Sequence, residues 1–196
     1  MLTTRVITEP ITSPVTIDQV KNYIKLDESI AAEDALISKM ISSAIKLCEI
    51  KTNLAFSEKT IEAFFTKDEI VLNSLRLPFA PHASIISITG QDINGVEETI
   101  DSALYFKTGN KLWEIAMSAS ALLYESYTVK YKAGYGIAEN LAITPKIYGT
   151  EKLPEEAELA ILKQVASWYD NRDEYLPVLS SEVRKILDSI SLTPWF

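Results

Sequence analysis

Few residues in this chain could take part in chemistry. The 196 residues include one histidine, His82, and one cysteine, Cys48. A Ser-His-Asp or Cys-His arrangement would have to use His82, which we expect to be a surface or packing residue of a loop. Cys48 falls on the apolar stripe of an expected helix, where a small buried hydrophobe is the simplest interpretation. A single cysteine also excludes an internal disulfide and a zinc cluster.

The stretch VKYKAGYG, residues 129–136, has the local pattern of a phosphate loop, because a strand-like segment ends in two glycines. A dinucleotide-binding loop needs G-x-G-x-x-G directly before a helix. Gly134 and Gly136 lack the third glycine, and the next expected helix begins only near Pro154. The Gly-Lys-Ser/Thr of a P-loop is also absent. We therefore interpret the glycines as a strand end that allows a sharp exit with positive φ, and we expect no cofactor.

Carboxylates are abundant, but their spacing predicts neither a metal site nor an acid-base pair. Adjacent acids such as Glu97 and Glu98 point to different faces of a strand, and no calcium-loop pattern occurs. Nineteen basic and 27 acidic residues leave a net charge of −8, which disfavours tight binding of DNA phosphates. We interpret the acidic segments as solvated faces, with a negative surface that keeps nucleic acid mobile as the alternative. A carboxylate-dependent hydrolase would need a pocket that gathers several acids, so we expect no enzyme.

Helical periodicity occupies both ends of the chain. Thr16, with a glutamine three residues later, has the pattern of a capping box that starts a helix over 17–25. Apolar residues at a spacing close to 3.6 predict a longer helix over 33–52. Pro154 is well placed in the first turn of a third helix. The segment SSEVRKILDSI, residues 180–190, predicts a short fourth helix.

Between about residues 57 and 134 the period changes to two, which is typical of short strands. Turn residues at Asn94-Gly95 and around Gly109 separate the strands, and RLPFAPHAS should be an extended connection. The strand candidates are TIEAFFTK, EIVLN, SIISITGQ, LYFKTGNKLWEI and SYTVKYKAG. We therefore predict an α+β fold in which N-terminal and C-terminal helices pack as a small helical bundle with an inserted antiparallel β segment. The predicted divisions are 1–56, 57–134 and 135–196.

The end of the sequence is unusually apolar. Leu192, Pro194, Trp195 and Phe196 place large apolar side chains where residues are usually polar. They could dock on their own domain or, as aromatic anchors, in a pocket of a partner. No secretory signal is expected, and no segment reaches about 18 uninterrupted apolar residues, so no membrane span is expected.

The order of these pieces resembles the head-tail connector (adaptor) proteins of tailed bacteriophages and gene-transfer particles. The similar segments are PVTIDQVKNYIKLDE, EDALISKMISSAIKLCE, YTVKYKAGYG and LPEEAELAILKQVASWYDNRDE. Two features depart from the family pattern, since residues 137–152 form a longer loop and the β segment is large. The family features fall on Val129, Tyr131, Ala133, Gly134, Tyr135, Gly136, Leu153, Pro154, Trp168, Tyr169, Asn171 and Arg172.

The resemblance implies a structural role in a virion neck, assembled in the cytoplasm of a bacterial host. Such proteins form a ring, commonly of twelve subunits, beneath the portal protein. Duplex DNA passes through the ring without sequence recognition, and tail or stopper proteins attach below. The family's C-terminal segment tends to reach toward the portal, which implies portal binding by Leu192, Pro194, Trp195 and Phe196. A head-closure or tail-completion protein, or an acidic oligomeric protein-binding module, remains the alternative.

Overall fold

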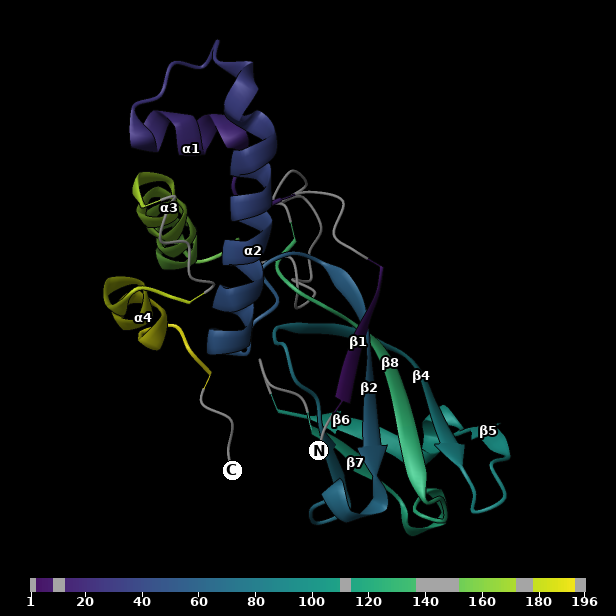
Figure 1. The fold of residues 1–196 in the computed structure, drawn as a ribbon. Helices are drawn as coiled ribbons and strands as arrows, with labels where there is room; N and C mark the ends of the chain where they lie inside the picture. The colour runs from purple at the N-terminus through teal and green to yellow at the C-terminus, as the bar shows by residue number, and fades with distance from the viewer. Residues whose placement is uncertain (1–2, 9–12, 110–113, 137–151, 172–177, 193–196) are drawn as a thin grey trace, which may run out of the picture. The chain divides into compact units, whose positions relative to one another are not determined.

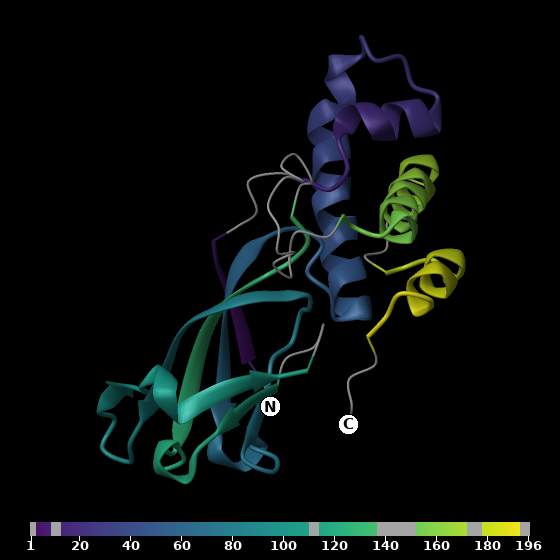
Figure 2. The ribbon, with the colours of Figure 1, turned by 180° about the vertical axis from the view of Figure 1, so that it is seen from behind.

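The computed structural model describes residues 3–8, 13–109, 114–136, 152–171 and 178–192. The chain forms two compact units, which are described separately (Figures 1 and 2). The first combines Met1–Ile11 with Ser57–Glu151, and we call it the β unit. The second combines Thr12–Phe56 with Lys152–Phe196, and we call it the helical unit.

The β unit contains two antiparallel sheets, and the smaller one lies across one face of the larger (Figures 1 and 2). In spatial order, the five-stranded sheet consists of β1 (Thr3–Thr8), β2 (Lys59–Thr66), β8 (Ser126–Ala133), β4 (His82–Gln91) and β5 (Glu97–Thr99). The three-stranded sheet consists of β3 (Ser74–Arg76), β7 (Glu114–Met117) and β6 (Tyr105–Thr108). Short 3-10 turns, η2 (Lys67–Glu69), η3 (Ser102–Leu104) and η4 (Ala119–Ala121), connect them.

Alternation of side chains along the central strands separates a buried face of the large sheet from an outer face. In β2 and β8, which pair over their whole length, every second residue is buried. The buried set includes Ile61, Phe65, Tyr127, Val129 and Tyr131. The residues between them are mostly polar and lie on the outer face, which holds the hollow described below.

The helical unit consists of α1 (Ile17–Ile24), the 3-10 turn η1 (Ala31–Glu33), α2 (Asp34–Thr52), α3 (Glu155–Asp170) and α4 (Ser181–Asp188). α2 contacts the other three helices, and α3 contacts α1 and α4. The predicted capping box is present, since the Thr16 hydroxyl accepts from the Gln19 amide at 3.2 Å and the Gln19 side chain accepts from the Thr16 amide at 2.7 Å. Ile37, Ala44 and Ile161 are fully buried at the centre of this unit.

Two buried charged side chains bind backbone groups of the segments that connect or follow helices in the helical unit. Lys21 is 2% exposed, and its Nζ lies 2.6 Å from Asp34 Oδ1 while donating to the Glu28 carbonyl at 3.0 Å. Glu49 is 6% exposed, and its Oε1 accepts from the Phe56 amide at 2.7 Å. The first pair connects α1 to the start of α2, and the second fixes the turn after α2.

The α+β class and the expected helices are confirmed, while one predicted strand is wrong and three strands, β1, β3 and β5, were not expected. EIVLN does not form a strand, because η2 occupies its start and a turn with positive φ at Leu72 and Asn73 occupies its end. β1 was not expected, since TTRVIT is exposed throughout and shows no buried alternation. Residues 137–151 of the expected loop 137–152 lie outside the described residues.

Candidate interaction surfaces

Gly134 shows why the AGYG segment needs glycine. Its φ is +117°, and a Cβ at this position would collide with the carbonyl group of Ser57. Its amide donates to the Pro81 carbonyl at 2.9 Å, and the following residue, Tyr135, is buried. The glycine therefore permits a close approach between backbone segments at the end of β8, as the interpretation of a sharp strand exit predicted.

His82 is a packing residue at the start of β4. Its side chain is fully buried, and its ring packs edge-on against Tyr131 with centroids 5.5 Å apart. The Pro78 carbonyl oxygen accepts from the Tyr131 hydroxyl at 2.7 Å and lies 2.9 Å from His82 Nε2. Burial raises the pKa of the Tyr131 hydroxyl well above its usual value. This cluster joins the strands to the preceding connection and has no access to a substrate.

Cys48 is a core residue of α2, as predicted. It is fully buried, and burial together with the neighbouring charge of Glu49 raises the pKa of its thiol to about 12. A thiol held in this protonated form is a poor nucleophile. In the described ranges, no three His, Cys, Asp or Glu side chains come together to hold a metal ion.

The other residues singled out from the sequence fall into two groups. Trp168 is 4% exposed on α3, and Tyr169 follows it on the same helix, so both belong to the helical unit. Leu192 donates its amide to the Thr52 carbonyl at 3.0 Å, which attaches the chain to the end of α2 immediately before the apolar tail. Arg172, Pro194, Trp195 and Phe196 lie outside the described residues, so the predicted portal-binding segment stays a prediction.

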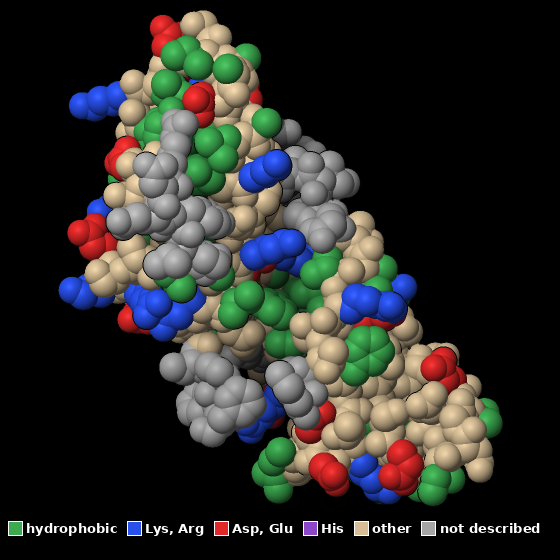
Figure 3. Space-filling model, viewed as in Figure 1, with side chains coloured by type: hydrophobic (Ala, Val, Ile, Leu, Met, Phe, Trp, Pro, Cys, Tyr) green, Lys and Arg blue, Asp and Glu red, His purple; other side chains and the backbone are tan. Residues whose placement is uncertain are grey.

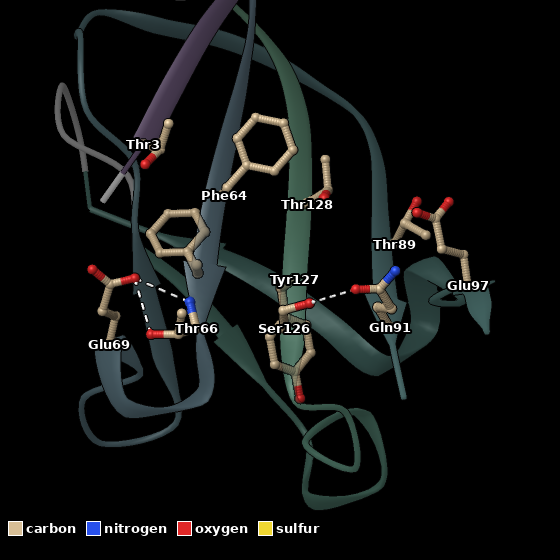
Figure 4. Close-up of a pocket in the computed structure, with 11 residues that line it drawn as sticks. Thr3, Phe64, Thr66, Glu69, Thr89, Gln91, Glu97, Ser126, Tyr127 and Thr128 are labelled. Carbon is tan, nitrogen blue, oxygen red and sulfur yellow. Dashed lines mark hydrogen bonds between the residues drawn. The ribbon is translucent and has the colours of Figure 1, made fainter. Parts of the chain in front are cut away.

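The outer face of the large sheet carries a hollow of about 420 Å³ (Figure 4). Ser126 contacts Gln91 at 3.4 Å, and Glu69 accepts from the Thr66 amide at 3.0 Å and from its hydroxyl at 3.2 Å. Hydroxyls, an amide, two carboxylates and the Phe64 ring line the hollow, and such a lining is suited to contact with another molecule. Its lining residues are Thr3, Phe64, Phe65, Thr66, Glu69, Thr89, Gln91, Glu97, Ser126, Tyr127 and Thr128.

Sequence reasoning missed this hollow because its residues come from strands far apart in the chain. Thr128 on β8 faces Phe64 on β2 and Thr89 on β4, so three segments contribute to one row. Each of these three residues alone is an ordinary outward-facing position. Only the strand order brings them together. Among the described residues, no helix is long and apolar enough to cross a membrane.

No family model and no curated protein matches this chain. Solved structures do match. A chain of the neck of an empty gene transfer agent particle, computed with C6 symmetry, is 17% identical with a TM-score of 0.74, covering 99% of this chain and 97% of that one. This chain has the fold of that neck chain. A chain of the native gene transfer agent virion is also 17% identical, with a TM-score of 0.71 and coverage of 98% and 97%. A third, from the native neck computed with C12 symmetry, is 15% identical with a TM-score of 0.70 and coverage of 99% and 97%.

Proposed function

We propose that this chain is a structural subunit of the neck of a phage-like particle. The observation that carries the proposal is the fold shared with chains of gene transfer agent particles over nearly the full length of both chains. A match of this extent includes both units rather than one common module. The function is therefore assembly, and no catalysis is assigned to the chain.

Within the neck, the role that fits best is the adaptor ring that joins the portal to the tail or stopper. The motif resemblance supports this choice, and the sixfold and twelvefold symmetries used for the similar necks are consistent with a ring of twelve copies. The N-terminal and C-terminal helices would form the bundle, with the β segment as an insertion in the chain. The division of the chain supports this arrangement, because the N-terminal and C-terminal helices belong to one unit. Assembly would take place in the cytoplasm of the bacterial host.

Passage of duplex DNA through the ring is consistent with the chain's charge. A net charge of −8 offers few attractive contacts to phosphates, so a sliding duplex would break few bonds. Electrophoretic mobility shift of linear duplex DNA should show no retained complex at about 150 mM salt. Stable, salt-resistant DNA binding would contradict this part of the proposal.

The direct test is imaging of the purified chain mixed with the portal protein of its own particle. We expect negative-stain images of closed rings stacked on the portal, and a mass corresponding to twelve copies. A chain that remains monomeric at high concentration and ignores the portal would overturn the neck proposal. A chain that binds only to a preformed portal-adaptor complex would instead be a head-closure or tail-completion protein.

The apolar tail has its own test. Leu192 is attached to α2 by its backbone, so deleting residues 193–196 should leave the helical unit folded. We expect the truncated chain to keep its circular dichroism spectrum and to lose most of its affinity for the portal. Global unfolding of the truncated chain would show that the tail belongs to the core.

A further inference from the structure

One end of the β unit is formed by three loops that are held together by backbone hydrogen bonds. The loops are residues 67–73, 92–98 and 119–125, and we call them the acidic end. The Lys67 amide donates to the Glu125 carbonyl at 3.0 Å, and the Glu125 amide donates to the Gln91 carbonyl at 2.9 Å. Figure 3 shows acidic side chains, a basic one and apolar side chains along this end of the β unit. The loops therefore present one continuous surface.

The acidic end exposes large aliphatic side chains on all three loops. Leu72 is 92% exposed, Ile93 85% and Leu123 74%, and Val71 and Val96 are at least half exposed. Leu72 also has a φ of +51°, a conformation that costs a residue with a Cβ on the order of 1 kcal/mol. A glycine or asparagine would suit that turn better. Clusters of exposed aliphatic side chains mark surfaces that contact another protein.

Most of the chain's net negative charge also gathers on these loops. They contain one cation, Lys67, and six carboxylates, a sum of 1 − 6 = −5 compared with −8 for the whole chain. Glu125 pairs with Lys67 at 3.1 Å, and Glu98 accepts from Tyr124. The other carboxylates are Asp68, Glu69, Asp92 and Glu97. Asp68 and Glu97 form no ion pair with any described residue, so they are available to a basic partner.

A complementary surface lies on α2. The side of this helix opposite its buried residues carries a stripe at positions 35, 39, 42, 46 and 50. Lys39 and Lys46 lie on this stripe and form no ion pair with any described residue. Ile50 is 69% exposed at its end, and Ala35 and Ser42 complete it. The stripe is therefore basic, partly apolar and free of carboxylates.

We propose that the acidic end of one copy docks on the α2 stripe of a second copy. The opposite charges attract, and the exposed aliphatic side chains of the loops cover Ile50 and the small residues beside it. The two surfaces differ, so the contact is heterologous, and a repeated heterologous contact closes into a ring when the rotation allows. This inference rests on the proposed ring and names the subunit contact within it. An anionic membrane does not suit the acidic end, because both carry negative charge.

A charge exchange tests the contact with two double variants. Asp68→Lys/Glu97→Lys makes the acidic end basic, and Lys39→Glu/Lys46→Glu makes the stripe acidic. Each variant alone should associate about tenfold or more weakly than the unaltered chain in analytical ultracentrifugation, because like charges then face each other. A mixture of the two should assemble again, since each repaired contact joins one variant to the other. In such rings the two variants would alternate, so the number of subunits would be even.

A matched control separates local charge from net charge. Lys152→Glu/Lys185→Glu changes the net charge as much as Lys39→Glu/Lys46→Glu does, and the Lys152 pair that it breaks is exposed and weak. We expect this control to assemble like the unaltered chain. If the control and Lys39→Glu/Lys46→Glu lose assembly equally, or if the mixture fails to assemble, the proposed contact is wrong. If the unaltered chain forms no ring, alone or with the portal, the neck proposal itself fails. If the unaltered chain forms rings but the charge exchange does not behave as expected, only the proposed contact fails.

A separate variant tests the exposed aliphatic side chains of the acidic end. Leu72→Asn removes the exposed side chain and places a residue that tolerates positive φ in the turn. We expect assembly to weaken severalfold while the melting temperature stays equal or rises. Val178→Asn, at a half-exposed position of the helical unit, serves as the control and should leave assembly unchanged. Unchanged assembly of Leu72→Asn would remove the acidic end from the contact.

Discussion

The two units bury polar groups in different ways. In the β unit two buried hydroxyls bind neutral backbone groups, since Tyr131 donates to the Pro78 carbonyl and Tyr127 to the Ala121 carbonyl at 3.1 Å, while Lys59 at the start of β2 is a buried charged side chain. In the helical unit the Lys21 ammonium and the Glu49 carboxylate are buried and bind backbone groups of adjoining connections. A sheet pairs most of its backbone groups internally, whereas helix ends leave orphan groups that charged side chains can satisfy. The hydroxyl contacts of the β unit should therefore be sensitive to shape, and the Lys21 and Glu49 contacts of the helical unit to charge.

The largest expected effect tests shape in the β unit. Gly134→Ala should destabilise the fold by on the order of 4 kcal/mol, because the added methyl meets the Ser57 backbone and the residue must keep a positive φ. Gly95→Ala is the control, since its φ is also positive but nothing lies within 4 Å of an added Cβ. Its cost should be about 1 kcal/mol. Urea unfolding measures both, and equal costs would contradict a steric role for Gly134.

The second prediction tests charge in the helical unit. Asp34→Ala should cost about 3 kcal/mol, because it leaves the Lys21 ammonium buried without its partner. Lys21→Met should cost less, since it removes the buried ammonium and leaves a carboxylate that is 39% exposed as a side chain, with only its Oδ1 buried. Chemical denaturation of both variants gives the comparison. A larger cost for Lys21→Met would show that the ammonium's backbone contact matters more than its charge.

A smaller effect is expected from a neutral hydrogen bond in the β unit. Tyr131→Phe should cost about 1 kcal/mol, because it removes the hydroxyl while His82 stays beside the same carbonyl. Tyr124→Phe, which removes an exposed hydrogen bond to Glu98, should cost less than Tyr131→Phe. Thermal unfolding would measure both. A cost of several kcal/mol for Tyr131→Phe would break the contrast between the units.

The smallest effect on stability at neutral pH is expected from the Cys48 thiol. Its folded pKa of about 12 exceeds the ordinary value of 9.0, so its contribution to stability is complete below pH 9 and declines as the pH rises toward 12. At pH 8 the native thiol should therefore react with Ellman's reagent only when the chain unfolds. The rate should rise with urea in parallel with loss of helical signal. Rapid reaction in the native state would show that α2 opens locally.

Local signals predicted the helices well. Thr16 and the residue three positions later form the expected capping box, and Pro154 stands immediately before α3. The turn at Gly95 was predicted in the same way and has a positive φ. These features depend on residues within one or two turns of each other. Short-range chemistry is therefore enough to place them.

Contacts between distant segments were beyond local reasoning. The reason why Gly134 must be glycine lies at Ser57, and the burial of His82 depends on Tyr131. β1 was missed because its pairing with β2 leaves every side chain exposed, so its sequence shows no amphipathic alternation. Pattern-based prediction needs one face of an element to be buried, and an edge strand of this kind has none.

For the candidate surfaces, too, some features follow from local sequence and others depend on contacts between distant segments. Composition and spacing are enough to predict an α+β chain and an acidic net charge. The hollow on the sheet and the acidic end depend on strand order, because β8 brings Ser126 beside both Thr66 and Gln91. Antiparallel pairing joins loops that are tens of residues apart in the chain. A sequence specifies such neighbours only through its long-range packing, which is why the surfaces became visible in the folded molecule.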